Sequence, residues 1–168
     1  MNRALLLAVL PVLTLAYVLP SSLDDDPRCD SDWTYFDVTS SCYYVGSENN
    51  FDSAQADCAS IGGNLTSIHN GFENNFVASL TEIGAKESTD DMTWIGLRYV
   101  ANKWTWTDGS DTSYLNWMKG RPQKDTNKYA CVQASILQDD YKGAKTQWND
   151  VECNIKMRKY VCKKPAKF

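Results

Sequence analysis

Residues 94–97 are Trp94-Ile95-Gly96-Leu97, a short apolar run, and residues 104–109 are Trp104-Thr105-Trp106-Thr107-Asp108-Gly109. The second run alternates aromatic and β-branched residues and ends in the turn former Asp-Gly. Runs of this kind, bounded by turn residues, are typical of paired β-strands. Gly96 inside an apolar strand indicates that another part of the backbone approaches closely there. We therefore place this strand pair at the centre of a mixed helix and sheet (α+β) domain.

The length and composition indicate one domain with a substantial core. The chain has 168 residues, and 43% of them are hydrophobic. A chain of this length favours a single domain with short extensions. The formal net charge is −4. We expect no nucleic-acid binding, because contact with the phosphate backbone requires a basic surface.

The N-terminus has the pattern of a secretory signal peptide. A short positive segment at Asn2-Arg3 precedes an apolar run over residues 4–16, and small residues suit a cleavage site. We predict a signal peptide over residues 1–20, cleaved at about 16–22, and an acidic linker over residues 21–28. Because the run is too short to span a bilayer, we expect a secreted, extracellular protein with no transmembrane segment.

Cysteine usage points to the same compartment. The six cysteines are Cys29, Cys42, Cys58, Cys131, Cys153 and Cys162. An even number in a secreted chain predicts three disulfides, although spacing alone leaves about 15 pairings open. A zinc site is not indicated, because the chain has no C-x-x-C pair and only one histidine, His69.

Two helices are predicted before the central strands. Asn50 is a suitable N-cap for a helix over residues 51–61, which Gly62-Gly63 would end. Its expected core positions are Phe51, Ala54, Cys58 and Ile61. Asn70 with Glu73 resembles a capping box for the second helix. The apolar face of that helix is expected to contain Phe72, Phe76, Val77, Leu80 and Ile83.

The other segments are predicted as strands and loops. Residues 33–45 have the content of a strand or hairpin, and residues 131–137 and 157–162 that of single strands. Residues 84–91 and 138–145 are predicted as polar connections. Residues 114–128 form a long polar loop, and a loop of that length in a compact domain is usually functional or mobile.

Four motifs together resemble the C-type lectin-like domain family. They are Trp94-Ile95-Gly96-Leu97, Trp148-Asn149-Asp150 followed by Cys153, Tyr160-Val161-Cys162, and a cysteine inside the first helix. The resemblance covers residues 29–164 and leaves residues 165–168 as a basic tail. It implies two helices packed on antiparallel strands, with a long loop region and three disulfides.

The resemblance also implies the disulfide pairing of the long form of this domain. The implied pairs are Cys29–Cys42, Cys58–Cys162 and Cys131–Cys153. Cys58–Cys162 would close a loop of about 100 residues, worth roughly 4–5 kcal/mol in the chain-entropy model. Cys131–Cys153 would hold the two strands that present Asn149 and Asp150.

The calcium site of sugar-binding family members is degraded here. In those members a Glu-Pro-Asn or Gln-Pro-Asp triplet, a later acid and the Trp-Asn-Asp motif supply the ligands. This chain has Arg121-Pro122-Gln123 at the triplet and Tyr129 in place of the later acid. Pro122 matches the family's cis proline. Gln123, Asn149 and Asp150 remain as weak candidate calcium ligands.

Charge opposes a metal ion at this position. A unit charge about 4 Å from a divalent ion costs on the order of 8 kcal/mol at an effective dielectric constant near 20. Arg121 brings such a charge to the triplet. We therefore expect calcium, the family's usual cofactor, to bind weakly or not at all.

The same loop is rich in cations. Lys119, Arg121, Lys124 and Lys128 stand near a single acid, Asp125. One interpretation is a solvated surface loop. The other is a calcium-independent site for an anionic glycan, in which Arg121 would make bidentate contacts.

Three further candidates each have two interpretations. Trp117 either stacks on a sugar or anchors the loop. Asn149 and Asp150 either bind ligand or are structural, since the motif also occurs in relatives that bind no sugar. The basic segment from Cys153 to Phe168 is either a solvated face or a heparin-like binding surface.

Asn64-Leu65-Thr66 is a glycosylation sequon, so we expect a glycoprotein modified at Asn64. His69 is expected to be structural, and no partner for it is evident. A serine hydrolase would have to use this histidine, far in sequence from the loop. We therefore expect no catalytic residues and no enzyme activity.

The resemblance implies a secreted carbohydrate-binding lectin, with glycans as partners and a role in innate immunity. The alternative is a secreted protein-binding module on the same scaffold. Phospholipase inhibitors, venom components and ice-binding proteins in this family have such roles.

Overall fold

The computed structural model describes residues 26–82, 92–135 and 146–168. The predicted signal peptide and most of the acidic linker lie outside the described residues. So do Ile83, the predicted 84–91 loop, the end of the predicted 131–137 strand and the 138–145 turn.

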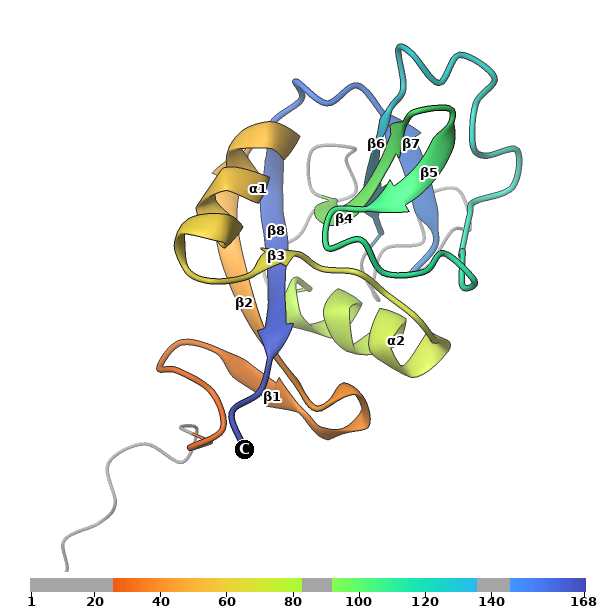
Figure 1. The fold of residues 1–168 in the computed structure, drawn as a ribbon. Coiled ribbons are helices and arrows are strands. Elements are labelled where there is room, and N and C mark those ends of the chain that lie inside the picture. The colour runs from red at the N-terminus through yellow and green to blue at the C-terminus, as the bar shows by residue number, and fades with distance from the viewer. Residues whose placement is uncertain (1–25, 83–91, 136–145) are drawn as a thin grey trace, which may run out of the picture.

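The described residues form one mixed sheet with two α-helices, and a short 3-10 helix, Asp37–Thr39, lies between the first two strands (Figure 1). The strands are β1 Thr34–Phe36, β2 Ser41–Asn49, β3 Asn64–Leu65, β4 Thr93–Val100, β5 Lys103–Trp106, β6 Cys131–Ala134, β7 Trp148–Val151 and β8 Met157–Pro165. The main path runs β1-β2-β8-β4-β6-β7, with β3 paired to β8 and β5 paired to β4. Only β4 and β8 pair in parallel among these strands.

The predicted central strand pair is confirmed. β4 and β5 are antiparallel, with Leu97 opposite Trp106. A Cβ added to Gly96 would lie 2.7 Å from Thr107 Oγ1 and still closer to the carbonyl oxygen of Leu65. The backbone of β3 therefore crosses β4 at a distance that only glycine permits, as the sequence pattern predicts.

Both predicted helices are present, and each begins at its predicted cap. α1 spans Phe51–Ser60, and the Asn50 side chain accepts a hydrogen bond from the Ser53 N–H at 2.9 Å. α2 spans Gly71–Leu80, and Asn70 accepts from the Glu73 N–H at 2.9 Å. These bonds satisfy N–H groups that the first helical turn leaves without a partner.

Two predicted core positions are wrong. Ile61 is 39% exposed, because it lies at the C-cap, where the chain leaves α1. Phe72 is 74% exposed. The buried face of α2 begins one residue later than the apolar pattern indicates, because two polar side chains take part in it. Its members are Glu73, Asn74, Val77 and Ala78.

Two hydrophobic clusters lie on either side of the sheet. Trp94 packs in one with the buried residues of α1, and Ile95 packs in the other with Val77 of α2. Successive strand residues point to opposite faces, so β4 is buried on both. This position explains why its sequence is a continuous apolar run rather than an alternating one.

Three disulfides connect these elements, and they are the pairs that the resemblance implies: Cys29–Cys42, Cys58–Cys162 and Cys131–Cys153. The second joins α1 to β8 across a sequence separation of 104 residues. The third joins β6 to the segment after β7. The predicted α+β architecture is thereby confirmed.

Candidate functional site

The long loop after β5 is attached to β7 by its backbone. The N–H of Met118 donates to the carbonyl oxygen of Trp148 at 2.9 Å, and the N–H of Trp148 donates to that of Asn116 at 2.7 Å. The Trp117 ring lies 4.9 Å from that of Trp104 and 6.2 Å from that of Trp148. These contacts favour the loop-anchor interpretation of Trp117.

The loop brings the degraded triplet against the Trp-Asn-Asp motif. The Arg121–Pro122 peptide bond is cis. Arg121 Nη1 lies 3.2 Å from Asp150 Oδ1, and the Gln123 backbone N–H donates to Asp150 Oδ2 at 2.8 Å. The Asp150 side chain is fully buried, whereas that of Arg121 is 28% exposed. Three of the predicted site residues therefore meet at one point.

The residues present at this point do not fit calcium. Calcium requires about 6–8 oxygen ligands, several of them anionic. Both carboxylate oxygens of Asp150 already accept hydrogen bonds, and one donor is a permanent cation. Asn149 Oδ1 is buried and has no partner within the described part of the chain. The amide oxygens of Gln123 and Asn149 carry no formal charge, so they cannot offset the charge of Arg121.

The predicted cations of the loop are partly neutralised. Lys128 Nζ lies 3.5 Å from Glu152 Oε1, and Arg121 is paired with Asp150. Lys119 and Lys124 are exposed and make no ion pair within residues 26–82, 92–135 and 146–168. The loop thus keeps two exposed cations close to Arg121 in the sequence that make no ion pair with the described residues.

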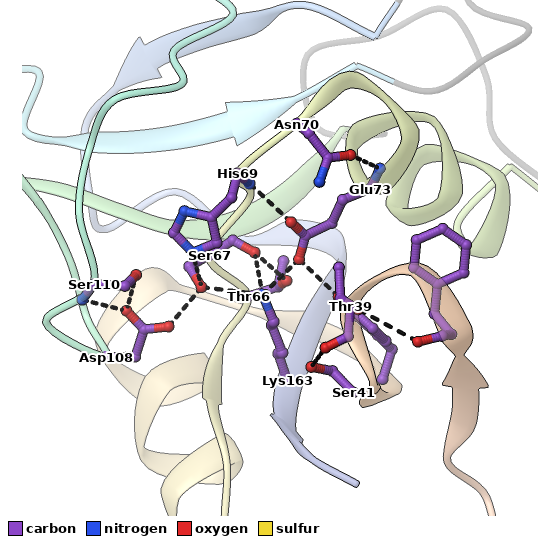
Figure 2. A network of polar contacts seen from close by, with 12 residues as sticks. Thr39, Ser41, Thr66, Ser67, His69, Asn70, Glu73, Asp108, Ser110 and Lys163 are labelled. Carbon is purple, nitrogen blue, oxygen red and sulfur yellow. Dashed lines mark hydrogen bonds and ion pairs between the residues drawn. The ribbon is translucent and has the colours of Figure 1, made fainter.

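A second polar cluster lies inside the domain, between β2, α2 and β8 (Figure 2). Glu73 is fully buried, and its Oε1 contacts Lys163 Nζ at 2.5 Å and accepts from the Tyr43 hydroxyl at 2.7 Å. Burial, together with the Glu73 carboxylate, raises the pKa of Tyr43 well above its usual value. Glu73 Oε2 accepts from the backbone N–H of His69 at 2.8 Å.

This cluster corrects three sequence-based interpretations. The Glu73 side chain binds the N–H one residue before the cap, so it does not complete the predicted capping box on Asn70. The Lys163 side chain is only 15% exposed, so the solvated-face interpretation is wrong for that residue. His69 does have a partner, because its Nε2 lies 3.1 Å from Ser67 Oγ.

Ser67, His69 and Asp108 meet without forming a nucleophilic triad. Asp108 Oδ2 accepts from Ser67 Oγ at 2.5 Å, whereas His69 Nδ1 has no partner among the described residues. Burial raises the pKa of Asp108, but hydrogen bonds from Ser110 and Ser67 outweigh it and lower that pKa overall. In a triad the acid orients the histidine, and here it holds a buried serine instead.

Two cavities of the described residues were not anticipated from the sequence. One, of about 350 Å³, lies beside Asp108 and Lys163 and is bordered by Asn64. The other, of about 320 Å³, lies between the first turn of α2 and the long loop. Asn64 is half-buried, and its Oδ1 accepts from Gln55 Nε2 at 2.9 Å. Its glycosylation stays a prediction.

Comparison with known proteins agrees with this architecture. The sequence model of the lectin C-type domain matches residues 47–164. The chain belongs to the C-type lectin family. It is 35% identical to the galactose-specific lectin nattectin of Thalassophryne nattereri over 138 residues, covering 81% of this chain and 80% of nattectin.

Solved structures of the family have the same fold. The carbohydrate-recognition domain of the mouse scavenger receptor C-type lectin superposes with a TM-score of 0.65 at 26% identity, covering 83% of this chain and 98% of that domain. A calcium-independent type II antifreeze protein superposes with a TM-score of 0.66 at 28% identity, covering 82% and 95%. The fold is therefore shared by a carbohydrate-recognition domain and an antifreeze protein.

Proposed function

We propose that this protein is a secreted lectin that recognises anionic glycans without calcium. The observation that carries the proposal is the contact between Arg121 and Asp150, in which a guanidinium takes the place that a metal ion would need. The galactose-specific relative supports sugar recognition, and the calcium-independent antifreeze protein supports a family scaffold that works without the ion.

The proposed site has donors left for an anion. A guanidinium carries five N–H donors in a planar fork, and Arg121 uses only Nη1 in its contacts with Asp150. Its side chain remains partly exposed. A sulfate or carboxylate group would bind the remaining edge, and Lys119 and Lys124 would add attraction at longer range.

Secretion is part of the proposal. All six cysteines are in disulfides, which persist in oxidising compartments. No helix within the described ranges is both long and apolar enough to cross a bilayer. Detection of the mature chain in culture medium, with an N-terminus between about residues 17 and 23, tests the predicted cleavage.

The test of function is a glycan array that includes sulfated and sialylated glycans, probed in calcium and in chelator. We expect binding to anionic glycans that persists in chelator. Lys119→Ala with Lys124→Ala should weaken this binding several-fold, because it removes two positive charges from the loop. Both side chains are exposed, so the double variant should fold normally. Lys103→Ala, which removes an exposed lysine outside both the loop and the basic segment from Cys153 to Phe168, is the control.

Arg121→Lys completes the test at the centre of the site. The substitution keeps one positive charge beside Asp150 but removes the planar fork. Binding should fall while the thermal unfolding midpoint changes little. Binding that disappears in chelator would instead mean that a metal ion is held despite Arg121. A protein-binding module is the second candidate, and it gains weight if no glycan binds in either condition.

A further inference from the structure

A cavity of about 320 Å³ lies away from the Arg121–Asp150 contact and shares no lining residue with it. It is formed where the first turn of α2 faces the long loop and Thr146, which lies just before β7. The lining residues that the inference uses are Asn70, Phe72, Asn75, Tyr114, Asn116 and Thr146. Its volume falls at the lower end of the range for small-molecule sites, about 300–1,000 Å³.

The cavity is lined by two aromatic rings and by a side-chain amide that a hydrogen bond holds in place. Phe72 is 74% exposed at the edge of the cavity, an unusual position for a phenylalanine. The Tyr114 ring packs edge-on against Trp148 at 5.7 Å, and burial raises the pKa of its phenol, which stays neutral near pH 7. Asn116 Nδ2 donates to the carbonyl oxygen of Thr146 at 3.0 Å, which holds that amide in place.

The chemistry of this lining is polar but uncharged. None of the residues that line the cavity carries a formal charge, and four of them are asparagines. A side-chain amide offers both donors and an acceptor. Asn70 already uses its acceptor and Asn74 uses both within the protein, so Asn75 and the acceptor oxygen of Asn116 are left to match neighbouring hydroxyl groups. An aromatic ring offers a flat apolar surface for the C–H face of a sugar ring. A charged ligand would find no partner here.

We propose that this cavity binds one uncharged pyranose residue. The ring lies against Phe72, and its hydroxyl groups bond the amides of Asn75 and Asn116. Binding at this site is independent of Arg121 and of calcium.

The test uses ¹⁵N-labelled, disulfide-intact protein titrated separately with methyl β-galactoside, methyl α-mannoside and N-acetylglucosamine. We expect at least one sugar to cause saturable shifts in the Asn75 and Asn116 side-chain NH₂ signals. Phe72→Ala should weaken this binding about 3- to 10-fold, from the worth of one aromatic contact. Phe168→Ala removes an aromatic ring that is 94% exposed elsewhere and should leave binding unchanged.

Gly71→Leu tests the cavity without relying on loss of a contact. A Cβ at Gly71 would meet only Tyr114 Oη, at 3.9 Å, so the larger side chain enters the cavity without a clash with the backbone. Because leucine also favours a helix more than glycine does, the variant should fold normally and lose the shifts. Arg121→Ala should retain them, which separates this site from the anionic one.

Three results would overturn the inference. The first is saturable binding that persists in Gly71→Leu. The second is the absence of saturable shifts with all three sugars up to about 100 mM, which is weaker than the affinity expected of a small-ligand cavity. The third is a set of shifts that surrounds Arg121 rather than Phe72.

Discussion

The buried pair of Lys163 and Glu73 allows a sharp test of how the interior is stabilised. Glu73 is fully buried on α2, and Lys163 reaches it from β8 with Nζ at 2.5 Å. Lys163→Met keeps the aliphatic length of the side chain but removes the charge. The carboxylate would then keep only its hydrogen bonds from Tyr43 and from the His69 N–H.

The expected cost follows from the burial of each partner. Removing one member of a buried ion pair typically costs about 3–5 kcal/mol, because the remaining charge is neither solvated nor paired. Lys163→Met should reach this range, since Glu73 has no exposed surface. Glu73→Gln should cost less. It retains hydrogen-bonding atoms toward Tyr43 and His69, and Lys163 is 15% exposed and also contacts Ser67.

Urea unfolding of the two single variants and the double variant, with disulfides intact, measures these free energies. The double variant should be more stable than Lys163→Met alone, because no uncompensated charge remains. Lys159→Met is the matched control. It removes a β8 lysine whose only described contact is an exposed one with Ser47. Equal costs for the two single variants, or strict additivity in the double variant, would refute the reasoning.

Three other predictions concern separate parts of the molecule. Gly96→Ala should destabilise the domain by about 1–3 kcal/mol in urea unfolding, because its Cβ would overlap the Leu65 carbonyl group; a neutral result would show that β3 can move. Hydrogen bonds from Lys164 and Lys167 lower the pKa of Asp30 to about 2. The contact of Asp30 with these lysines should stabilise the folded protein above about pH 4, and this stabilisation should disappear as the pH falls toward 2. An NMR titration of the Asp30 carboxyl group with a midpoint near 4 would contradict this. Calcium at 10 mM should leave the thermal unfolding midpoint unchanged relative to chelator, since a ligand that binds the folded state raises it; an increase of several degrees would mean that a site exists.

Local sequence patterns were sufficient for much of the fold. The caps at Asn50 and Asn70 stand where the helices begin, and the Trp94 and Trp104 runs pair as predicted. These features depend on interactions between residues close in the chain, or on one steric fact such as the absence of a Cβ at Gly96. The departure from the family's calcium-binding triplet is also read directly from residues 121–123, and the absence of calcium stays a prediction.

Only the tertiary structure decided the contacts between segments that are distant in the sequence. The Lys163–Glu73 pair joins positions 90 residues apart, and Arg121 meets Asp150 across 29. Periodicity places an apolar stripe on a helix, but it does not say which neighbouring strand offers a partner for a polar side chain. α2 therefore buries Glu73 and Asn74, which Lys163 and Trp148 satisfy, and leaves Phe72 exposed beside a cavity. The physical reason is that a polar side chain is buried only where the fold brings a partner to it. The spacing of residues along one helix or strand does not show which distant residue will be that partner.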